Sequence, residues 1–600
     1  MNATAKAPNP RDVSAAKDWL RALERTAPIA RNPGRILPLV IADLAGQRRD
    51  APALVSERET FSFHSLAKRM NQYSRWALQQ GLRKGDVVAL LMGNRPEYVA
   101  AWLGISAVGG IVALLNTNLV GRSLWHCIDV VRPRHIIVAS ELAEQITSAP
   151  ATDADLKVWI HGSDRGGSAR IDHLLQEISP VDLSSAERPY LSIEDIALYI
   201  YTSGTTGLPK AANVSHGRVL QWANWFAGML DIQPEDRIYN CLPMYHSIGG
   251  VLVPGAALVS GASIAVRESF SAGQFWDDVI RWDCTMVQYI GEFCRYLLNT
   301  RDTPNERNHR IRVACGNGLS ADVWQGFSKR FHIPRIVEFY ASTEGGLSLF
   351  NAEGEPGAIG RVPAYLAHRY SPVLVRFDAE SGEPVRDQHG FCFRCDVDEA
   401  GEALAKLRAD SSQAGSRFEG YTDAAASEGK LLHDVFECGD AWVRTGDLMR
   451  RDSRGFFYFV DRVGDTFRWK GENVATTEVA QAVASLPGVL HAVVYGVKVG
   501  GSEGRAGMAA IESEGDLDLA GLRRHLADCL PSYARPVFLR LLRDCEVTGT
   551  LKYSKSELMR QGFNPELTSD AIYFDNPETQ TLQPVDRALF DRIQSGQVRF

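Results

Sequence analysis

Several features that would assign a chain to a special class are missing from this sequence. Its ten cysteines are scattered along 600 residues without the spacing of a disulfide framework, a pattern typical of reduced thiols in a cytosolic protein. Basic residues are not in excess, because the formal net charge is −7. Nucleic acid is therefore not expected as a partner, since phosphate binding needs a concentrated basic surface. Internal repeats are lacking too, and residues 1–35 contain no apolar core that would predict a signal peptide.

Long apolar runs are equally scarce, and one of them needs an interpretation. Tyr98 to Leu115 spans 18 residues without a charge, which is the length of a short membrane span. Gly109 and Gly110 divide it, and the part after them is strand-like, so we expect a buried helix followed by a buried strand. The protein is therefore expected to be cytoplasmic and not to span a membrane. Peripheral contact with the inner face of a membrane stays open, as does the choice between monomer and homodimer.

The order of the predicted elements indicates an α/β fold. A chain of 600 residues is too long for one hydrophobic core, so at least two domains are expected. Between about residues 50 and 350, short apolar runs such as 87–91, 111–115 and 135–140 alternate with amphipathic helical patterns. This alternation is typical of parallel strands joined by crossover helices.

The chain changes character after about residue 370. Up to about residue 460 the strand patterns are shorter and separated by turn residues, which predicts an antiparallel or barrel-like subregion. After Arg462 a helix–strand unit and a further helix predict a small α+β domain. We therefore expect a large N-terminal domain of residues 1–461, with parallel-type sheets, flanking helices and the barrel-like subregion, and a small α+β domain of residues 462–600.

The strongest chemical signal is the run YTSGTTGLPK at residues 201–210, between a predicted strand and a predicted helix. Hydroxyl groups and glycines give a loop whose backbone N–H groups can approach an anion closely, and Lys210 adds a positive charge. This composition suits the β- and γ-phosphates of a nucleotide, although the spacing of a Walker A loop is absent. A flexible surface turn is the alternative, and the unbroken hydroxyl–glycine run disfavours it. The residues assigned to phosphate binding are Thr202, Ser203, Gly204, Thr205, Thr206, Gly207 and Lys210.

This loop and the motifs that follow it resemble those of the adenylate-forming superfamily, which includes acyl-CoA synthetases, luciferases and adenylation domains. The later motifs are LPMYH at 242–246 with Gly249 and Gly250, Gly316-Asn317-Gly318-Leu319, YASTE from Tyr340 to Glu344, Thr445-Gly446-Asp447, and Asp461-Arg462. Segments at residues 289–299, 463–479 and 547–555 resemble the branch that contains very-long-chain acyl-CoA synthetases and fatty acid transport proteins. The similarity runs from about residue 50 to the C-terminus.

The resemblance implies ATP, Mg²⁺ and coenzyme A as cofactors. Glu344 would bind the magnesium ion, which accepts a single protein carboxylate beside phosphate oxygens, and Thr343 would donate to the α-phosphate. The turn of Gly316, Asn317 and Gly318, together with the flat face of Tyr340, would contact the adenine.

The same resemblance implies that Asp447 accepts hydrogen bonds from the ribose hydroxyls, with Arg462 as a second ribose contact. By its composition alone, Thr-Gly-Asp would indicate an ordinary turn. His246 would be a gate residue near the acyl–adenylate junction, while the roles of general base, metal ligand or packed wall residue are the alternatives. Most superfamily members complete the adenylation site with a lysine directly after a glycine. Here the run is TGTLKYSK, so Lys552 is assigned that role and Lys555 is the alternative.

Two half-reactions at one acyl carbon imply a mobile C-terminal domain that rotates between them. The superfamily hinge falls near Gly464, and a glycine can absorb a large change in φ and ψ. Arg468, Trp469, Lys470 and Gly471 would then face the pantetheine of coenzyme A. Cys392 and Cys395 have the Cys-x-x-Cys spacing, but positions three apart in a strand point to opposite faces, so no zinc site is expected.

The sequence therefore predicts an ATP-dependent ligase that activates a long- or very-long-chain fatty acid as an acyl-adenylate and transfers it to coenzyme A. The same chemistry on an aryl, bile-type, medium-chain or short-chain acid is one alternative, and transfer of the adenylate to a carrier protein is another. A fatty acid transport protein coupled to acyl-CoA formation is a third. A lipid-binding protein with a vestigial catalytic site is disfavoured by the intact set of Lys210, Thr343, Glu344 and Asp447, because lipid binding needs no nucleotide site.

Overall fold

The structure is a computed structural model that describes most of the chain. The described residues are 14–147, 156–163, 169–202, 209–370, 372–378, 381–407, 417–470, 472–500, 504–542, 555–598 and 600. They divide into two compact units. The first unit consists of Met1–Gly360 and Leu407–Leu431, and the second consists of Arg361–Lys406 and Leu432–Phe600. These units are defined by compactness. The predicted domain boundary between residues 461 and 462 is instead a boundary between segments that move separately, and it stays a prediction.

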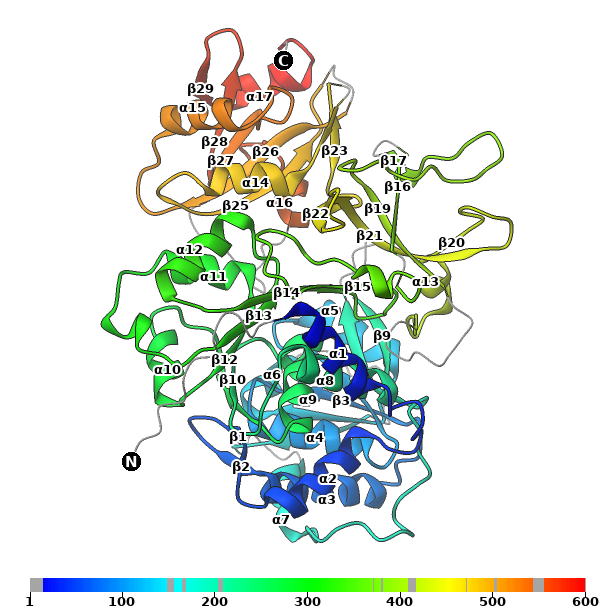
Figure 1. Ribbon diagram of the computed structural model, residues 1–600. Coiled ribbons are helices and arrows are strands. Elements are labelled where there is room, and N and C mark those ends of the chain that lie inside the picture. Colours follow the sequence, from blue (N-terminus) through cyan, green and yellow to red (C-terminus); the bar gives the residue numbers. More distant parts are fainter. Residues whose placement is uncertain are drawn as a thin grey trace. The chain divides into compact units, whose positions relative to one another are not determined.

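Two largely parallel sheets form the centre of the first unit (Figure 1). Among the described residues one sheet has the order β15-β14-β13-β12-β10-β11-β1-β2, and it is parallel except at its two edge pairs. Its strands are β1 (Pro52–Val55), β2 (Thr60–Ser62), β10 (Arg237–Asn240), β11 (Ser263–Val266), β12 (Met286–Ile290), β13 (Val313–Asn317), β14 (Ile336–Ala341) and β15 (Ser348–Asn351).

The second sheet of this unit has the order β7-β6-β5-β3-β4-β8-β9 among the described residues, and only the β8–β9 pair is antiparallel. Its strands are β3 (Val87–Leu91), β4 (Ile111–Leu114), β5 (His135–Ala139), β6 (Lys157–His161), β7 (Ala169–Arg170), β8 (Ile196–Thr202) and β9 (Lys210–Ser215). Every residue of β3, β4 and β5 is buried, as expected of parallel strands that are covered on both faces. The three apolar runs of the sequence are therefore confirmed as central parallel strands.

Helices connect and cover these two sheets. They are α1 (Ala15–Thr26), α2 (Leu37–Arg48), α3 (Phe63–Gln79), α4 (Pro96–Ser106), α5 (Gly121–Val131), α6 (Ala143–Thr147), α7 (Ile171–Glu177), α8 (His216–Met229), α9 (Val253–Val259), α10 (Phe275–Arg281), α11 (Gly291–Leu298), α12 (Ala321–Phe331) and α13 (Ala424–Glu428). The uncharged segment from Tyr98 to Leu115 is the wholly buried helix α4 followed by strand β4, as its glycine pair predicted. In the described ranges, no helix has both the length and the apolar character that a membrane crossing requires.

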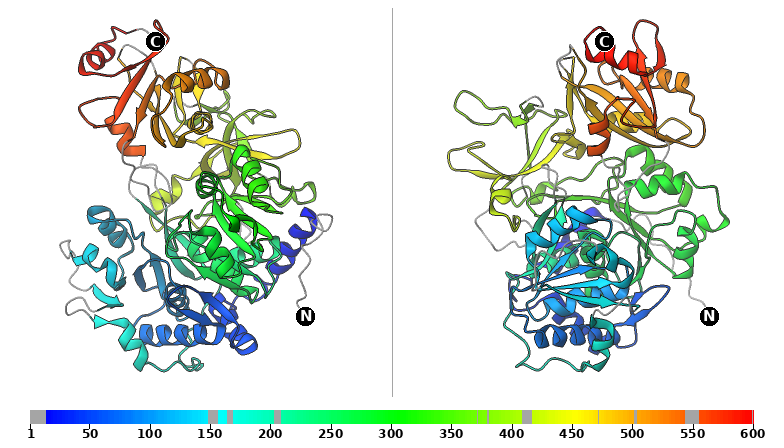
Figure 2. Two further views of the ribbon diagram at one scale, coloured as in Figure 1. Left: turned by 90° about the vertical axis from the view of Figure 1, so that its left-hand side faces the viewer. Right: turned by 180° about the vertical axis from the view of Figure 1, so that it is seen from behind.

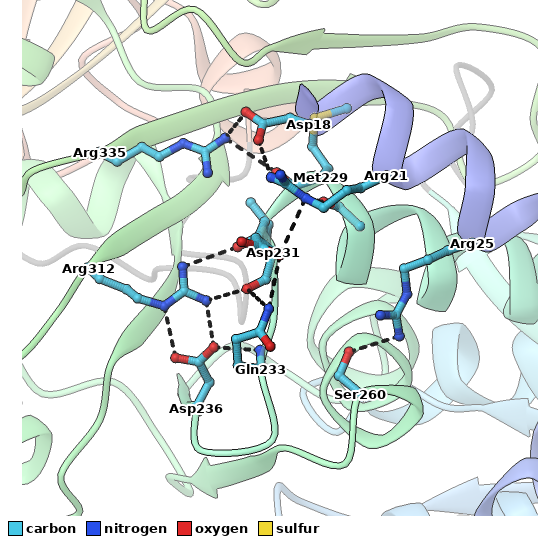
Figure 3. A network of polar contacts seen from close by, with 12 residues as sticks. Asp18, Arg21, Arg25, Met229, Asp231, Gln233, Asp236, Ser260, Arg312 and Arg335 are labelled. Atoms are coloured by element: carbon cyan, nitrogen blue, oxygen red, sulfur yellow. Dashed lines mark hydrogen bonds and ion pairs between the residues drawn. The ribbon is translucent and has the colours of Figure 1, made fainter. Parts of the chain in front are cut away.

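The N-terminal helix α1 belongs to the first unit through a network of ion pairs (Figure 3). It packs along α8, and its Asp18, only 2 % exposed, pairs with both Arg21 and Arg335. Arg335 lies directly before β14 and also donates to the Met229 carbonyl at 3.3 Å. Burial raises the pKa of Asp18, and the two arginines oppose that rise. Residues before position 35 thus include a helix that is anchored beside the strand leading into YASTE.

The second unit holds the remaining strands. Its first sheet has the order β16-β19-β21-β20, with β22 on β21, and its β16–β19, β19–β21 and β21–β22 pairs are antiparallel. Strands β17 and β18 pair with each other in a separate antiparallel ribbon. The bounds are β16 (Val373–Val375), β17 (Phe377–Asp378), β18 (Glu383–Pro384), β19 (Gly401–Lys406), β20 (Leu431–His433), β21 (Ala441–Arg451) and β22 (Phe457–Arg462). This confirms the predicted antiparallel subregion.

A mixed sheet with the order β25-β26-β27-β28-β29 forms the C-terminal part of this unit. Helices α14 and α15 pack against its edge strands β25 and β29 (Figures 1 and 2). The bounds are β23 (Phe467–Trp469), β24 (Glu472–Val474), α14 (Thr476–Ala484), β25 (Val489–Val497), β26 (Ala506–Ser513), α15 (Leu519–Cys529), β27 (Phe538–Leu541), α16 (Lys555–Gln561), β28 (Ala571–Asn576), β29 (Thr581–Pro584) and α17 (Arg587–Gln594). The small α+β module that the sequence predicted after Arg462 is therefore present.

Candidate functional site

The predicted phosphate loop connects two antiparallel strands. Thr202, at the end of β8, pairs with Lys210, at the start of β9. Ser203, Gly204, Thr205, Thr206 and Gly207 lie outside the described residues. The sequence predicted a strand before the loop and a helix after it, and the structure adds β9 between the loop and α8. Lys210 is therefore held by a strand at the base of the loop.

A distant segment, residues 419–422, pairs with the other edge of β9. The amide of Asn213 donates to the Gly420 carbonyl at 2.9 Å, and the amide of Thr422 donates to the Ala211 carbonyl at 2.9 Å. Tyr421 is thereby bridged to Ala212, and its ring lies 5.8 Å from the ammonium group of Lys210. Backbone pairing with β9 thus brings an aromatic side chain to the base of the phosphate loop.

Glu344 contacts the hydroxyl group of Tyr421. Its carboxylate oxygen Oε1 accepts a hydrogen bond of 2.9 Å from the Tyr421 hydroxyl and is 3.5 Å from the Lys430 ammonium. The Glu344 residue is 8 % exposed. Burial is the main cause that raises the pKa of Tyr421, and the Glu344 charge adds to it, so this hydroxyl remains a donor at neutral pH. Lys210 and Glu344, which are far apart in the sequence, therefore contact the same tyrosine.

The backbone around Glu344 is fixed by a turn and by a buried ion pair. Arg218, in α8, donates to the Thr343 carbonyl at 2.9 Å and lies 3.4 Å from the Glu419 carboxylate, and the exposure of these two side chains is 1 % and 7 %. Glu419 accepts from the amide and hydroxyl of Ser215, and its own amide donates to the Glu344 carbonyl at 3.0 Å. Burial lowers the pKa of Arg218, and Glu419 and Glu344 oppose that effect. The sequence did not single out this pair, since no local pattern distinguishes either residue.

The predicted adenine turn begins in the last two residues of β13, Gly316 and Asn317, and is shaped by close contacts. A Cβ atom at Gly316 would lie 2.3 Å from the Tyr289 carbonyl, and Gly318 has a φ of +81°. Among the described residues the buried Oδ1 of Asn317 has no hydrogen-bond partner. It is therefore an acceptor that an exocyclic amino group could satisfy.

Glu338 supports this turn from the neighbouring strand β14. Its carboxyl group accepts from the Leu319 amide at 3.1 Å and from the Tyr289 hydroxyl. It is 1 % exposed, and burial raises its pKa to about 8. Glu338 was not among the predicted site residues, although a charged side chain in the apolar strand IVEFYA was a signal. Tyr340 lies two residues further along β14 and is half-buried.

His246 precedes a π-helical turn at Ile248–Leu252. Its ring lies 4.6 Å from that of Tyr245, whose hydroxyl accepts from Asn118 at 3.0 Å. A Cβ atom at Gly250 would lie 1.7 Å from the Met244 carbonyl, so the glycine is required for this close approach. Such π-helical turns occur often at functional sites. The packing positions His246 in the first unit, and its role as a gate residue stays a prediction.

The ribose-binding candidates are neighbours in the second unit. Asp447 in β21 pairs with Arg462 in β22, and the Arg462 Nε lies 3.6 Å from the Asp447 carboxylate. The Thr445 hydroxyl accepts from the Asp447 amide at 3.1 Å and donates to the Ala403 carbonyl at 2.8 Å. Thr-Gly-Asp therefore lies within strand β21, and the pairing of β21 with β22 places the Asp447 and Arg462 side chains next to each other.

The segment after Arg462 is linked to the start of α14. Asp461 is 1 % exposed and accepts from the hydroxyls of Thr466 and Thr476, both at 3.1 Å, while burial raises its pKa. Gly464, between these contacts, has a φ of +92° and no atom within 4 Å of a Cβ built on it. Lys555, the alternative adenylation lysine, donates to Asp465 at 2.8 Å, whereas Lys552 lies outside the described residues.

The four residues predicted to face pantetheine follow in the next hairpin. Arg468 and Lys470 are exposed, whereas Trp469 is 2 % exposed and packs edge-on against Phe600. Gly471 lies outside the described residues. Trp469 therefore belongs to the core of the second unit, and only its exposed neighbours present side chains to solvent.

The donor set near Glu344 fits a magnesium ion that arrives with a nucleotide. In the described part of the chain no three His, Cys, Asp or Glu side chains gather as a metal site, and this includes Cys392 and Cys395. Magnesium prefers one or two carboxylates together with substrate phosphates and water. The contacts found for Glu344 fall on Oε1, so Oε2 can serve as such a ligand beside the phosphate loop.

Comparison with known proteins shows the family to which the chain belongs. Residues 41–390 match the family model described as AMP-binding enzyme. The chain is 40% identical over 572 residues to long-chain fatty acid transport protein 2 of Rattus norvegicus, which covers 94% of this chain and 91% of that protein. It is 38% identical over 575 residues to long-chain fatty acid transport protein 1 of Mus musculus, covering 94% and 88%.

Solved structures share the fold at lower identity. The anthranilate CoA ligase AuaEII in complex with anthranoyl-AMP superposes with a TM-score of 0.75 at 20% identity, over 88% of this chain and 98% of that one. ATP-bound MatB from Rhodopseudomonas palustris gives a TM-score of 0.72 at 20% identity, over 88% and 99%. The predicted fold is thereby confirmed.

Proposed function

Because the chain belongs to the AMP-binding enzyme family, we propose that it activates a long- or very-long-chain fatty acid with ATP and transfers the acyl group to coenzyme A. In the first half-reaction the fatty acid carboxylate attacks the α-phosphorus of ATP and pyrophosphate leaves. In the second, the thiol of coenzyme A attacks the acyl carbonyl, loses its proton, and AMP leaves. The choice of acid is supported by relatives across 94% of the chain that are named long-chain fatty acid transport proteins.

One observation carries the proposal: Lys210 lies against the ring of Tyr421 and Glu344 accepts from its hydroxyl, next to the base of the phosphate loop. Displacement at phosphorus needs positioning and charge stabilisation more than a covalent nucleophile. Lys210 would neutralise phosphate charge, and the Thr343 hydroxyl would donate to the α-phosphate. Glu344 would hold Mg²⁺, which when bound neutralises charge on the departing pyrophosphate.

The remaining residues would bind the nucleoside and complete each half-reaction. Asn317 would accept from the adenine amino group, while Asp447 and Arg462 would contact the ribose. Lys552 would serve adenylation, with Lys555 as the alternative, and Arg468 and Lys470 would contact coenzyme A. We also propose domains of residues 1–461 and 462–600 that rotate about Gly464 between the two half-reactions.

Acid-dependent exchange of radiolabelled pyrophosphate into ATP tests the first half-reaction. The wild-type protein should show exchange only with a long-chain fatty acid and Mg²⁺ present, and EDTA should remove it. Addition of coenzyme A should then yield equal amounts of AMP and acyl-CoA. Exchange without any acid, or acyl-adenylate that coenzyme A does not consume, would contradict the proposal.

A second candidate function, fatty acid uptake, has support in the names of the relatives. Conversion to acyl-CoA would trap an acid that has entered the cell, so uptake would depend on the ligase chemistry. Cells that express Glu344→Gln should then take up no more labelled fatty acid than cells without the protein. We propose a cytoplasmic location, in line with the free cysteines of the described residues, with peripheral contact at the inner membrane face as the alternative. Cell fractionation distinguishes the two.

A further inference from the structure

Lys430 belongs to none of the sequence motifs, yet it contacts the proposed magnesium ligand. Its ammonium group lies 3.5 Å from Oε1 of Glu344, and its side chain is 25% exposed. Lys210 lies 5.8 Å from the ring of Tyr421, which donates to Glu344, and the buried Arg218, paired with Glu419, also interacts electrostatically with Glu344. Lys430 thus adds a cation that pairs directly with Glu344, next to the base of the phosphate loop.

Short-range structure holds Lys430 in this place. It follows the helix α13, whose first turn is capped by Asp423, and its amide donates to the Ser427 carbonyl at 3.1 Å. The Ser427 hydroxyl in turn accepts from the Tyr421 amide at 2.8 Å. Because Tyr421 is paired with β9, the same segment positions the hydroxyl and the ammonium group that both reach Glu344. Helix α13 and the pairing of Tyr421 with β9 both fix the position of Lys430, whereas an ordinary surface ion pair has no such support.

Magnesium and Lys430 cannot both remain on Glu344 without a further negative charge. Two cations close to one carboxylate repel each other strongly at this degree of burial. The phosphates that would accompany the ion supply that charge, and a lysine side chain is long and flexible enough to turn toward them.

We propose that Lys430, which pairs with Glu344 in this structure, binds the β- or γ-phosphate of ATP. The inference rests on the proposed function, because it takes Glu344 as the magnesium ligand of an ATP site. The ammonium group of Lys430 would neutralise the same pyrophosphate group that leaves in the first half-reaction. AMP lacks both of these phosphates, so it should not use Lys430.

Calorimetric titration with Mg²⁺–ATP and with AMP tests this directly, without acid or coenzyme A. Lys430→Met should weaken Mg²⁺–ATP binding by about tenfold or more, because a hydrogen bond to a charged group is lost. The same variant should bind AMP within about twofold of wild type, and Lys430→Arg, which keeps the charge, should retain most of the ATP affinity. Lys329→Met, at an exposed lysine in the last turn of α12, is the matched control.

The outcomes separate the inference from the function on which it rests. Unchanged ATP affinity in Lys430→Met overturns the inference alone. An equal loss of ATP and AMP affinity also overturns it, since that result indicates a structural role. A wild-type protein that binds no ATP contradicts the proposed function, and the inference falls with it. Lys430→Gln repeats the test if Lys430→Met melts well below wild type.

Discussion

Tyr421 donates a hydrogen bond of 2.9 Å to Oε1 of Glu344, although 77 residues separate the two in the sequence. The contact exists because residues 419–422 pair with β9, the strand that begins at Lys210. Oε1 of the carboxylate is thereby held by a neutral donor, and Oε2 would bind the proposed magnesium ion. A tyrosine outside every recognised motif therefore has a defined position in the proposed ATP site.

Tyr421→Phe should reduce acid-dependent pyrophosphate exchange by about tenfold, because a hydrogen bond to a charged group contributes about 1.5–3 kcal/mol. The phenyl ring keeps the contact with Lys210, so the fold should be retained. Steady-state exchange at saturating ATP is the measurement, with Tyr190→Phe, whose residue is 81% exposed, as the matched control. Equal rates in the two variants would show that the hydroxyl does not orient Glu344.

Arg218→Met should lower the free energy of unfolding by about 3–5 kcal/mol, because it leaves the buried Glu419 carboxylate without its cation. Chemical denaturation followed by fluorescence measures the change. Arg35→Met removes a partner from the exposed Arg35–Asp43 pair and should cost about 0–1 kcal/mol. Similar losses in both variants would contradict the structural role assigned to Arg218.

Glu338 predicts a pH dependence of stability. Its folded-state pKa of about 8 lies above the ordinary value of 4.5. A carboxyl group with a raised pKa contributes stability that is complete below its unfolded-state pKa and is lost as the pH rises through the folded-state value. Glu338→Gln, which does not titrate, should therefore gain in melting temperature relative to wild type when the pH is raised from about 6 to about 9. A constant difference across this range would show that Glu338 does not titrate there.

Lys552→Ala and Gly464→Pro should separate the two half-reactions. Loss of a charge-assisted contact to a developing anion slows adenylation by about 10²–10³, while supplied acyl-adenylate should still react with coenzyme A in Lys552→Ala. Proline fixes φ near about −65°, so Gly464→Pro excludes the observed φ of +92°. If the proposed rotation between the half-reactions needs a positive φ at residue 464, Gly464→Pro should spare adenylation and block the thioester step.

Two further variants serve as controls for Gly464→Pro and Lys552→Ala. Gly488 has a φ of +89° and, like Gly464, no atom within 4 Å of a Cβ built on it, so Gly488→Pro measures the strain of the substitution alone. Equal slowing of both half-reactions by Gly464→Pro would remove the support for a rotation at this position. If Lys555→Ala fails in adenylation while Lys552→Ala does not, the lysine assignment moves to Lys555.

The elements that depend on local pattern were predictable from the sequence. The buried runs of β3, β4 and β5 and the division of Tyr98–Leu115 followed from apolar periodicity and from glycine positions. Strand β9 was missed, because its sequence KAANVS is short and carries no period-2 pattern of apolar residues. Burial of Trp469 could have been predicted, since strand alternation places it on the same face as Phe467.

The parts of the site that depend on distant pairing were not predictable. Tyr421 and Lys430 reach Glu344 through a backbone pairing with β9 that leaves no signal in either segment alone. Arg218 and Glu419 likewise form a buried pair across 201 positions, 218 to 419, that only the fold brings together. Motif order predicted which residues would carry the chemistry, and the tertiary structure shows which residues contact them.

The chain length of the acid tests the central claim most directly. The wild-type protein, supplied with ATP, Mg²⁺, coenzyme A and an equimolar mixture of acids from acetate to a very-long-chain fatty acid, should form acyl-CoA mainly from acids of about fourteen carbons or more, because each buried methylene contributes about 0.8 kcal/mol at most. Mass spectrometry of the thioesters gives the relative kcat/KM values, and Glu344→Gln should yield none. Predominant acetyl-CoA or an aromatic acyl-CoA would contradict the fatty acid substrate, and the absence of any thioester would contradict the ligase itself.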